Sequence, residues 1–210
     1  MGFQTLGKIL TANLRQNFLP HLLAAVFVMT AMTMLMGISA LNEVQSARSL
    51  EMIMPLAGVI LMTPVFHPEQ DENIRDVVRS KRTSYLAVCV LRVIYSVFFL
   101  GMLCGGFVCV MGLCESAVTV RHFVGGFASG LFLGTVGFFF AGLGRSVIVG
   151  YMASLIYYIA NYAFGRGIVF DLFSMTTAAD FYDVHIIAIK YLLIAAAVLM
   201  IVLCFVIMRD

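Results

Sequence analysis

The side chains that most often do chemistry in proteins are few in this sequence, and none of them forms a recognisable catalytic or metal-binding group. The four histidines stand alone, with no partner at the spacing of a zinc site, and no nucleophile lies beside a base. The five cysteines fall in or beside apolar runs, as small buried hydrophobic residues do. These residues are His21, His67, His122, His185, Cys89, Cys104, Cys109, Cys114 and Cys204. We therefore expect a chain that is not an enzyme and itself binds no metal or cofactor.

The residues needed for a carboxylate proton relay and for a phosphate-binding loop are also missing. No Asp or Glu has a firm position at the middle depth of an apolar segment, which argues against a pump built on a carboxylate relay. Gly2 to Lys8 fits the spacing of a phosphate-binding loop, but Ile9 stands where Ser or Thr is required. Any energy that drives this protein is therefore expected to come from another one.

Charge is concentrated in one stretch, HPEQDENIRDVVRSKRTS, from His67 to Ser84. Its acidic residues gather at the start and its basic residues at the end, which suits a short helix aligned with its own dipole. Ile74, Val77 and Val78 form a narrow apolar stripe on that helix. The charged residues are Glu69, Asp71, Glu72, Arg75, Asp76, Arg79, Lys81 and Arg82. The stretch is either a docking element for another protein or a solvated connector without a partner.

The rest of the chain is apolar, with 62% hydrophobic residues, 11% charged residues and a mean hydropathy of +1.02. This composition predicts an integral membrane protein, and a net charge of +2 without a basic cluster gives no support for a nucleic-acid partner. Residues 1–19 are expected to form an amphipathic helix on the membrane surface. Six apolar segments are each near the length of a transmembrane helix, at 21–41, 50–66, 85–111, 123–144, 147–164 and 186–208. The predicted fold is an all-α polytopic membrane protein.

Basic residues predict the orientation of these spans. The ends and loops on the side of the N-terminus hold Lys8, Arg15, Arg75, Arg79, Lys81, Arg82, Arg145 and Arg209, whereas the opposite side holds Arg48, Arg121, Arg166 and Lys190. The larger number favours an N-terminus and a C-terminus inside the cell. Arg92, in the third span, is expected to extend its head group toward the inner face, with a solvated cavity as the alternative.

Small residues and methionines indicate how the spans pack. Gly126, Gly130 and Gly134 repeat at four-residue spacing in the fourth span, which predicts close contact with another helix. That contact belongs either to one subunit, which is the commoner case, or to an interface between subunits. In the first span Met29, Met32 and Met36 form a stripe for which apolar packing is favoured over a copper path.

The connection from Gly165 to His185 is long and rich in apolar residues, and we expect it to dip into the membrane as a re-entrant or interfacial segment. The tyrosines before it belong either to the interfacial belt or to the wall of a substrate path. The candidate residues of such a path are Tyr151, Tyr158, Asn161 and Tyr162, with Tyr157 beside them.

The order of these elements resembles the permease subunits of ABC-2 type exporters. The most specific part is the inner loop and the span after it, PEQDENIRDVVRSKRTSYLAVCVLRVIYS. The resemblance implies a multi-pass protein of the prokaryotic cytoplasmic membrane that works as a dimer, with itself or with a sister permease. It implies a separate ATPase that binds ATP and Mg, and a substrate such as an antimicrobial peptide, a drug or a lipid. The helix that couples to the ATPase would use Glu69, Asp71, Ile74, Arg75, Val77, Val78 and Arg79.

Two alternatives to this function come from different classes. One is a self-contained carrier or a metal-ion channel, and the other is a membrane scaffold or immunity protein that binds a ligand without transporting it. An adjacent reading frame for an ATPase would favour the first reading. The sequence leaves open the substrate and the direction of its movement.

Overall fold

The structure, a computed structural model, describes residues 18–70, 85–164, 170–177 and 184–207, and these residues form helices and their connections without a strand. Six of the helices are long and apolar enough to cross a membrane, which confirms the predicted all-α class with six candidate spans. The long helices are α2 (Leu19–Met36), α3 (Glu43–Met62), α5 (Tyr85–Leu113), α6 (Val120–Leu143), α7 (Val147–Phe164) and α9 (Val184–Ile207). Two short elements complete the described fold, the 3-10 helix η2 (Thr63–Gln70) and helix α8 (Ser174–Thr177).

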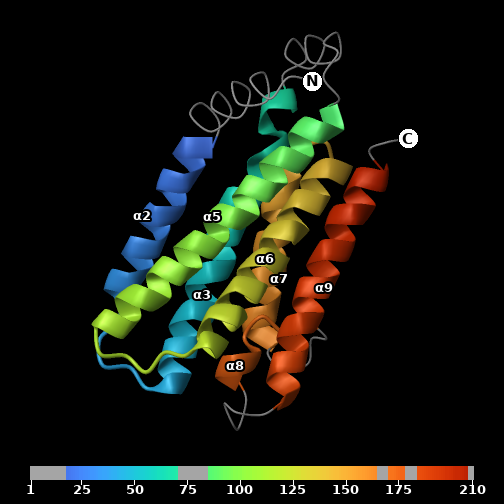
Figure 1. Ribbon diagram of the computed structural model, residues 1–210. Helices are drawn as coiled ribbons and strands as arrows, with labels where there is room; N and C mark the ends of the chain where they lie inside the picture. Colours follow the sequence, from blue (N-terminus) through green and yellow to red (C-terminus); the bar gives the residue numbers. More distant parts are fainter. Residues whose placement is uncertain (1–17, 71–84, 165–169, 178–183, 208–210) are drawn as a thin grey trace.

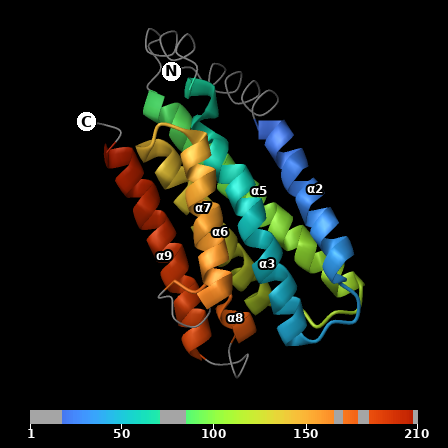
Figure 2. The ribbon, with the colours of Figure 1, turned by 180° about the vertical axis from the view of Figure 1, so that it is seen from behind.

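The long helices run up and down, side by side, in one bundle (Figure 1, and from behind in Figure 2). The start of α2, the end of η2, the start of α5 and the end of α9 all lie at one end, which we call the connector end. Helix α8 lies at the opposite end, the α8 end. Both ends of the charged stretch 71–84 therefore attach to the same end of the bundle.

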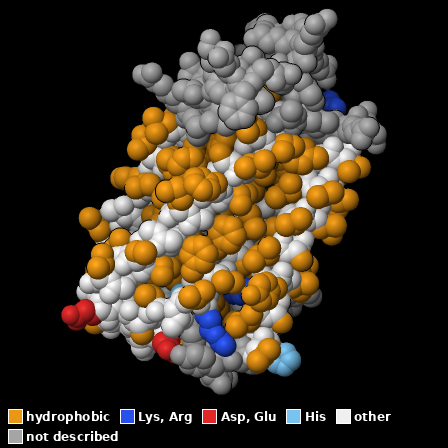
Figure 3. Space-filling view, viewed as in Figure 1, with side chains coloured by type: hydrophobic (Ala, Val, Ile, Leu, Met, Phe, Trp, Pro, Cys, Tyr) orange, Lys and Arg blue, Asp and Glu red, His pale blue; other side chains and the backbone are white. Residues whose placement is uncertain are grey.

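Helices α3 and α6 form the centre of the bundle. In the most hydrophobic 18 residues of the span that α3 begins, 83% of the residues are buried, and the corresponding share in α6 is 72%. In the other four long helices this share is between 11% and 28%. Hydrophobic side chains cover the middle of the face seen in Figure 3, and charged side chains gather at the α8 end of that face. A surface of this kind suits lipid, which accepts apolar side chains but not unpaired charges.

The predicted glycine face of α6 packs against α3. A Cβ atom on Gly130 would lie 2.8 Å from the carbonyl oxygen of Met54, and one on Gly134 would lie 2.6 Å from that of Gly58. Gly126 is nearly as close, with a Cβ position 3.2 Å from a methyl group of Leu50. Since these distances leave no room for a side chain, the glycines let the two central backbones touch within one subunit.

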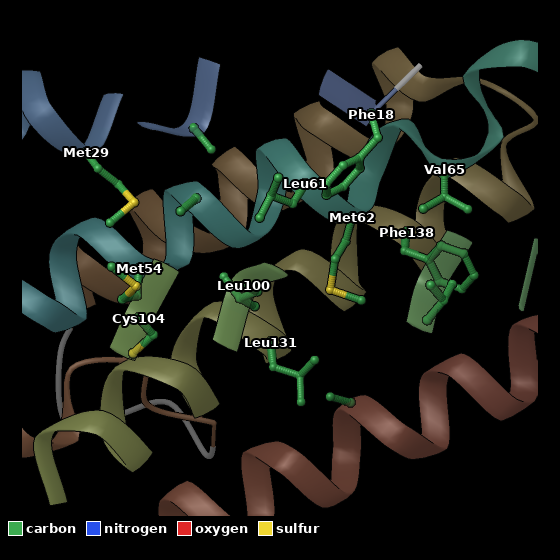
Figure 4. Close-up of a cluster of buried hydrophobic side chains, with 14 of the residues drawn as sticks. Phe18, Met29, Met54, Leu61, Met62, Val65, Leu100, Cys104, Leu131 and Phe138 are labelled. Atoms are coloured by element: carbon green, nitrogen blue, oxygen red, sulfur yellow. The ribbon is translucent and has the colours of Figure 1, made fainter. Parts of the chain in front are cut away.

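Apolar side chains fill the space around this contact (Figure 4). Met54 and Met62 of α3 meet Leu131 and Phe138 of α6 in one cluster of buried side chains, and Met29 of α2 joins it. Met29 is 6% exposed, and Met32 packs partly buried against the same cluster. Flexible thioethers in such positions fill irregular gaps, as favoured for the predicted methionine stripe.

The helix boundaries differ from the sequence-based prediction at the α8 end. Helix α3 starts at Glu43, a full seven residues before the predicted Leu50, because Asn42 and Gln45 form a capping box. Helix α2 ends at Met36 and not at Leu41, since Gly37 takes a φ of 73° that leaves the helical conformation. The apolar runs predicted where the spans lie, whereas Asn42 outside a run and Gly37 within one decided where α3 begins and α2 ends.

Two predicted elements fall mostly outside the described residues. The surface helix predicted at 1–19 is described only from Phe18, whose buried ring packs 4.7 Å from that of Tyr95 between centroids. Of the predicted coupling residues, the backbone of Glu69 lies in η2. The others, Asp71, Ile74, Arg75, Val77, Val78 and Arg79, lie outside the part of the chain that the structure describes.

Candidate functional site

A buried charge pair links α3 to α9 near the α8 end. The Nζ of Lys190 lies 2.6 Å from Oε1 of Glu51, and the two side chains are 2% and 0% exposed. Counted from their helix starts at Glu43 and Val184, each charge sits about two turns inside the bundle. Charges at such positions in a membrane protein are rare and commonly serve function.

The carboxylate of Glu51 also holds the start of α8. Its Oε1 accepts from the backbone N–H of Met175 at 2.9 Å, and its Oε2 accepts from that of Thr176 at 3.0 Å. The hydroxyl of Thr176 donates to Oε2 as well, at 2.6 Å. Including Lys190, the two carboxylate oxygens thus receive four donors, which stabilises their negative charge inside the protein.

The ammonium group of Lys190 is equally well satisfied. Besides Glu51, it donates to Oγ of Ser129 on α6 at 2.9 Å and to the carbonyl of Leu172 at 2.7 Å. The Ser129 hydroxyl donates in turn to that same carbonyl, at 2.9 Å. An ammonium group has three N–H donors, so all of them are used. A buried pair is stable only with such additional hydrogen bonds.

Helix α7 holds the same segment from another side. The side-chain amide of Asn161 donates to the carbonyl of Phe170 at 3.2 Å and accepts from the N–H of Leu172 at 2.9 Å. The hydroxyl of Tyr157 donates to the Phe170 carbonyl at 2.8 Å. Within the segment, Oδ1 of Asp171 accepts from the N–H of Phe173 at 2.8 Å. Polar groups from α3, α6, α7 and α9 therefore converge on residues 170–177, which we call the α8 segment.

Apolar contacts also hold the α8 segment in place, and we call its binding site on the long helices, polar and apolar together, its seat. Leu172 is fully buried and Phe173 is 5% exposed, in a cluster with Val59 and Leu193. The ring of Phe170 stacks on that of Phe132, with 5.3 Å between centroids. Residues 170–177 are therefore folded into the end of the bundle, and the predicted dip of the whole connection into the membrane stays a prediction.

The four residues proposed to line a substrate path lie differently from one another. Asn161 is fully buried and committed to the α8 segment, and the hydroxyl of Tyr158 donates to the carbonyl of Met52 at 3.1 Å. Tyr151 is partly buried in the cluster around Val59, whereas Tyr162 is 58% exposed. A substrate could touch Asn161 only after its hydrogen bonds to the α8 segment had opened, whereas Tyr158 is partly exposed.

The sequence analysis missed Glu51 and Lys190. It named no acidic residue at middle depth and counted Lys190 with the loops and ends opposite the N-terminus, whereas in the structure the two side chains are buried against each other. Glu51 had been placed in the first turn of its span because the start of α3 was predicted seven residues too late, whereas α9 starts only two residues before the predicted Ile186. One signal was present, since Glu51 and Lys190 are isolated opposite charges within otherwise apolar runs.

Another buried charge, Arg92, lies at the connector end. It is 6% exposed, and its Nη1 donates to the carbonyl of Val65 at 2.9 Å. It borders a cavity of about 20 Å³ whose lining also includes His21 and Ser96. The guanidinium thus reaches toward η2 at the connector end, the predicted direction, and its partner there is a protein carbonyl.

The described residues contain no group of three or more His, Cys, Asp or Glu side chains that could hold a metal ion. Their fold and apolar surface define a polytopic helical membrane protein with six candidate spans. Comparison with protein-family models, with curated proteins and with solved structures finds no match to this chain.

Proposed function

We propose that this chain is the membrane permease subunit of an ATP-driven exporter of the ABC-2 class. The observation that carries the proposal is the division of the bundle into two specialised ends. The charged stretch 71–84 joins η2 and α5 at the connector end, and the α8 segment closes against the opposite end. An exporter needs these two parts, a contact for its ATPase on one side and a closable exit on the other.

We call residues 71–84, the part of the charged stretch between η2 and α5, the connector, and its attachments would transmit movement to the centre of the bundle. Helix α3 runs directly into η2, which ends one residue before the charged stretch, and α3 packs by backbone contact on α6. A displacement of the connector would therefore act on the two most buried helices at once. We propose that an ATPase docks on Ile74, Val77 and Val78, while Asp71, Arg75 and Arg79 set its register by charge.

The proposed orientation places the connector end in the cytoplasm. Eight basic residues were assigned to that side, and four to the other. Because Lys190 lies within the bundle and pairs with Glu51, three remain on the α8 side: Arg48, Arg121 and Arg166. The corrected division strengthens the case for an N-terminus and a C-terminus inside.

The substrate is proposed to be amphipathic, an antimicrobial peptide, a drug or a lipid, moved along a path between two permease copies. The apolar surfaces of α2, α5, α7 and α9 suit such a molecule and the lipid around it. The α8 segment would close the outer end of that path, in the seat that Asn161, Glu51 and Lys190 provide.

Co-purification from native membranes tests this function. The tagged full-length chain should retain a soluble ATPase with a complete phosphate loop, and the complex should hydrolyse ATP faster when its substrate is added. A chain that moves a substrate in vesicles with no ATPase present would contradict the proposal.

One observation favours a second candidate, a self-contained carrier. A Glu–Lys pair inside a membrane protein is the kind of group that ion-coupled carriers use. In vesicles, such a carrier would respond to an imposed proton gradient, whereas the exporter would respond to ATP supplied with its partner. The exporter is favoured because the donors and acceptors of the pair are occupied by the α8 segment and Ser129.

A further inference from the structure

The hydrogen bonds of the α8 segment to the Glu51–Lys190 pair join groups on the long helices to groups on the segment itself. Glu51, Lys190 and Ser129 belong to α3, α9 and α6, so they are carried by the long helices and not by the segment. The segment contributes the backbone N–H groups of Met175 and Thr176, the Thr176 hydroxyl and the carbonyl of Leu172. The long helices thus form the binding site, and the α8 segment occupies it.

We propose that Glu51, Lys190 and Ser129 form a charge latch that binds the α8 segment and sets how readily it leaves the bundle. Glu51 supplies the negative charge for the N–H groups at the start of α8, and Lys190 supplies the positive charge for the carbonyl of Leu172. The two signs match the two kinds of backbone group. The latch deepens the proposed function, because it rests on the α8 segment closing the exit.

The ion pair makes release of the segment physically feasible. If Glu51 held the segment alone, departure of the segment would leave an isolated carboxylate inside the membrane, which is strongly unfavourable. In the observed geometry Lys190 lies 2.6 Å from Glu51 and also contacts Ser129, so the charges stay paired when the segment is gone. Release then breaks hydrogen bonds to the segment without creating an unpaired charge.

Apolar packing alone would distinguish the closed from the open position of the segment less well than hydrogen bonds to charged groups do. Leu172 and Phe173 are buried, and their removal from the bundle is opposed by the hydrophobic effect only where water replaces protein. Wherever the segment moves against lipid, lipid accepts these side chains, so apolar contacts there discriminate poorly between the closed and open positions. Hydrogen bonds to charged groups do discriminate, because lipid cannot replace them.

Hydrogen exchange on the purified full-length chain in lipid nanodiscs tests the latch. The double variant Glu51→Gln/Lys190→Met removes both charges, so neither is left unpaired. We expect the amides of residues 170–177 to exchange about tenfold faster or more, the change expected when hydrogen bonds to charged acceptors are lost. Exchange in the middle of α6 should stay unchanged. Arg48→Gln, an exposed charge on α3, is the matched control and should leave the segment protected.

A second variant keeps the test decisive if the double variant folds poorly. Thr176→Val removes the hydroxyl that donates to Oε2 of Glu51 and keeps the size of the side chain, at a partly exposed position. It should also raise exchange within 170–177 while the pair stays intact. Unchanged exchange of this segment in both variants would overturn the latch and assign its seat to apolar packing. An equal rise throughout α3 and α9 would overturn it as well, because the pair would then stabilise the whole fold.

These measurements need neither an ATPase nor a substrate. A chain that shows the latch but never binds an ATPase would contradict the proposed function and leave the latch standing. A complex that transports with its ATPase, but whose α8 segment exchanges at the same rate in both variants, would support the proposed function and contradict the latch.

Discussion

The Nζ of Lys190 and the Oε1 of Glu51, 2.6 Å apart, connect α9 to α3 although both helices pack mainly on α6. The pair therefore closes a ring of three helices near the α8 end. It also shows that two isolated charges from distant parts of the chain neutralise each other inside the bundle, which removes the main objection to either of them at that depth.

The pair should be far more sensitive to the loss of one charge than to the loss of both. Lys190→Met leaves Glu51 buried without its counter-charge and is expected to lower the free energy of unfolding by about 3–5 kcal/mol. The double variant Glu51→Gln/Lys190→Met should be close to the wild type. Unfolding in detergent, followed by circular dichroism in a double-mutant cycle, measures the coupling. Additive effects of the two single changes would contradict a direct interaction.

The contact between α3 and α6 should not tolerate a side chain at Gly130. A Cβ atom there would lie 2.8 Å from the carbonyl oxygen of Met54, so even Gly130→Ala must move backbone and is expected to cost about 1–3 kcal/mol. Gly130→Leu should disrupt folding or assembly. Gly106→Leu on α5 is the matched control, because no atom lies within 4 Å of its Cβ position. Equal expression and equal unfolding midpoints for the two leucine variants would contradict the close contact.

The hydrogen bonds of Asn161 should keep the α8 segment immobile. A spin label at Ser174, which is 5% exposed, should show restricted motion in the wild type. Asn161→Ala removes the donor to Phe170 and the acceptor for Leu172, so the label should become more mobile. Tyr162→Phe changes a more exposed residue of the same helix and keeps its ring contact with Phe173, so it should have no effect. A label that is equally mobile in all three proteins would place the segment outside its seat.

The connector end should face the cytoplasm. In intact cells, a membrane-impermeant thiol reagent should leave a cysteine at Ser80 unlabelled and should label one at Ala117, an exposed position between α5 and α6 at the α8 end. Both are introduced after replacement of the native cysteines, since Cys109 is exposed. Labelling of Ser80→Cys without labelling of Ala117→Cys would reverse the orientation and the proposed direction of export.

Docking of the ATPase should depend on the apolar stripe of the connector. Ile74→Asp and Val78→Asp are expected to reduce partner binding and substrate-stimulated ATP hydrolysis at least about tenfold, because apolar anchors carry most of an interface's affinity. Arg79→Gln should mainly slow association and change its salt dependence. Membrane insertion should be unaffected in all three. Full binding and full transport in both aspartate variants would leave the stretch as a solvated connector.

The sequence by itself determined the class of this protein and the number of its candidate spans. Six apolar runs of membrane length can be recognised without knowing their neighbours, because the bilayer selects length and composition in each helix separately. The spacing of Gly126, Gly130 and Gly134 likewise predicted one face of close contact, since four-residue spacing places them on one side of a helix.

Only the tertiary structure decided which surfaces meet. The glycine spacing is the same for a contact within a subunit and for one between subunits, and the carbonyl groups of Met54 and Gly58 show that α3 is the partner. Glu51 and Lys190 are far apart in the chain, and the depth of Glu51 depended on a helix start that capping by Asn42 sets outside the apolar run. Hydrophobic periodicity reports how each helix meets lipid or protein, whereas the pairing of two buried charges depends on which helices the fold brings together.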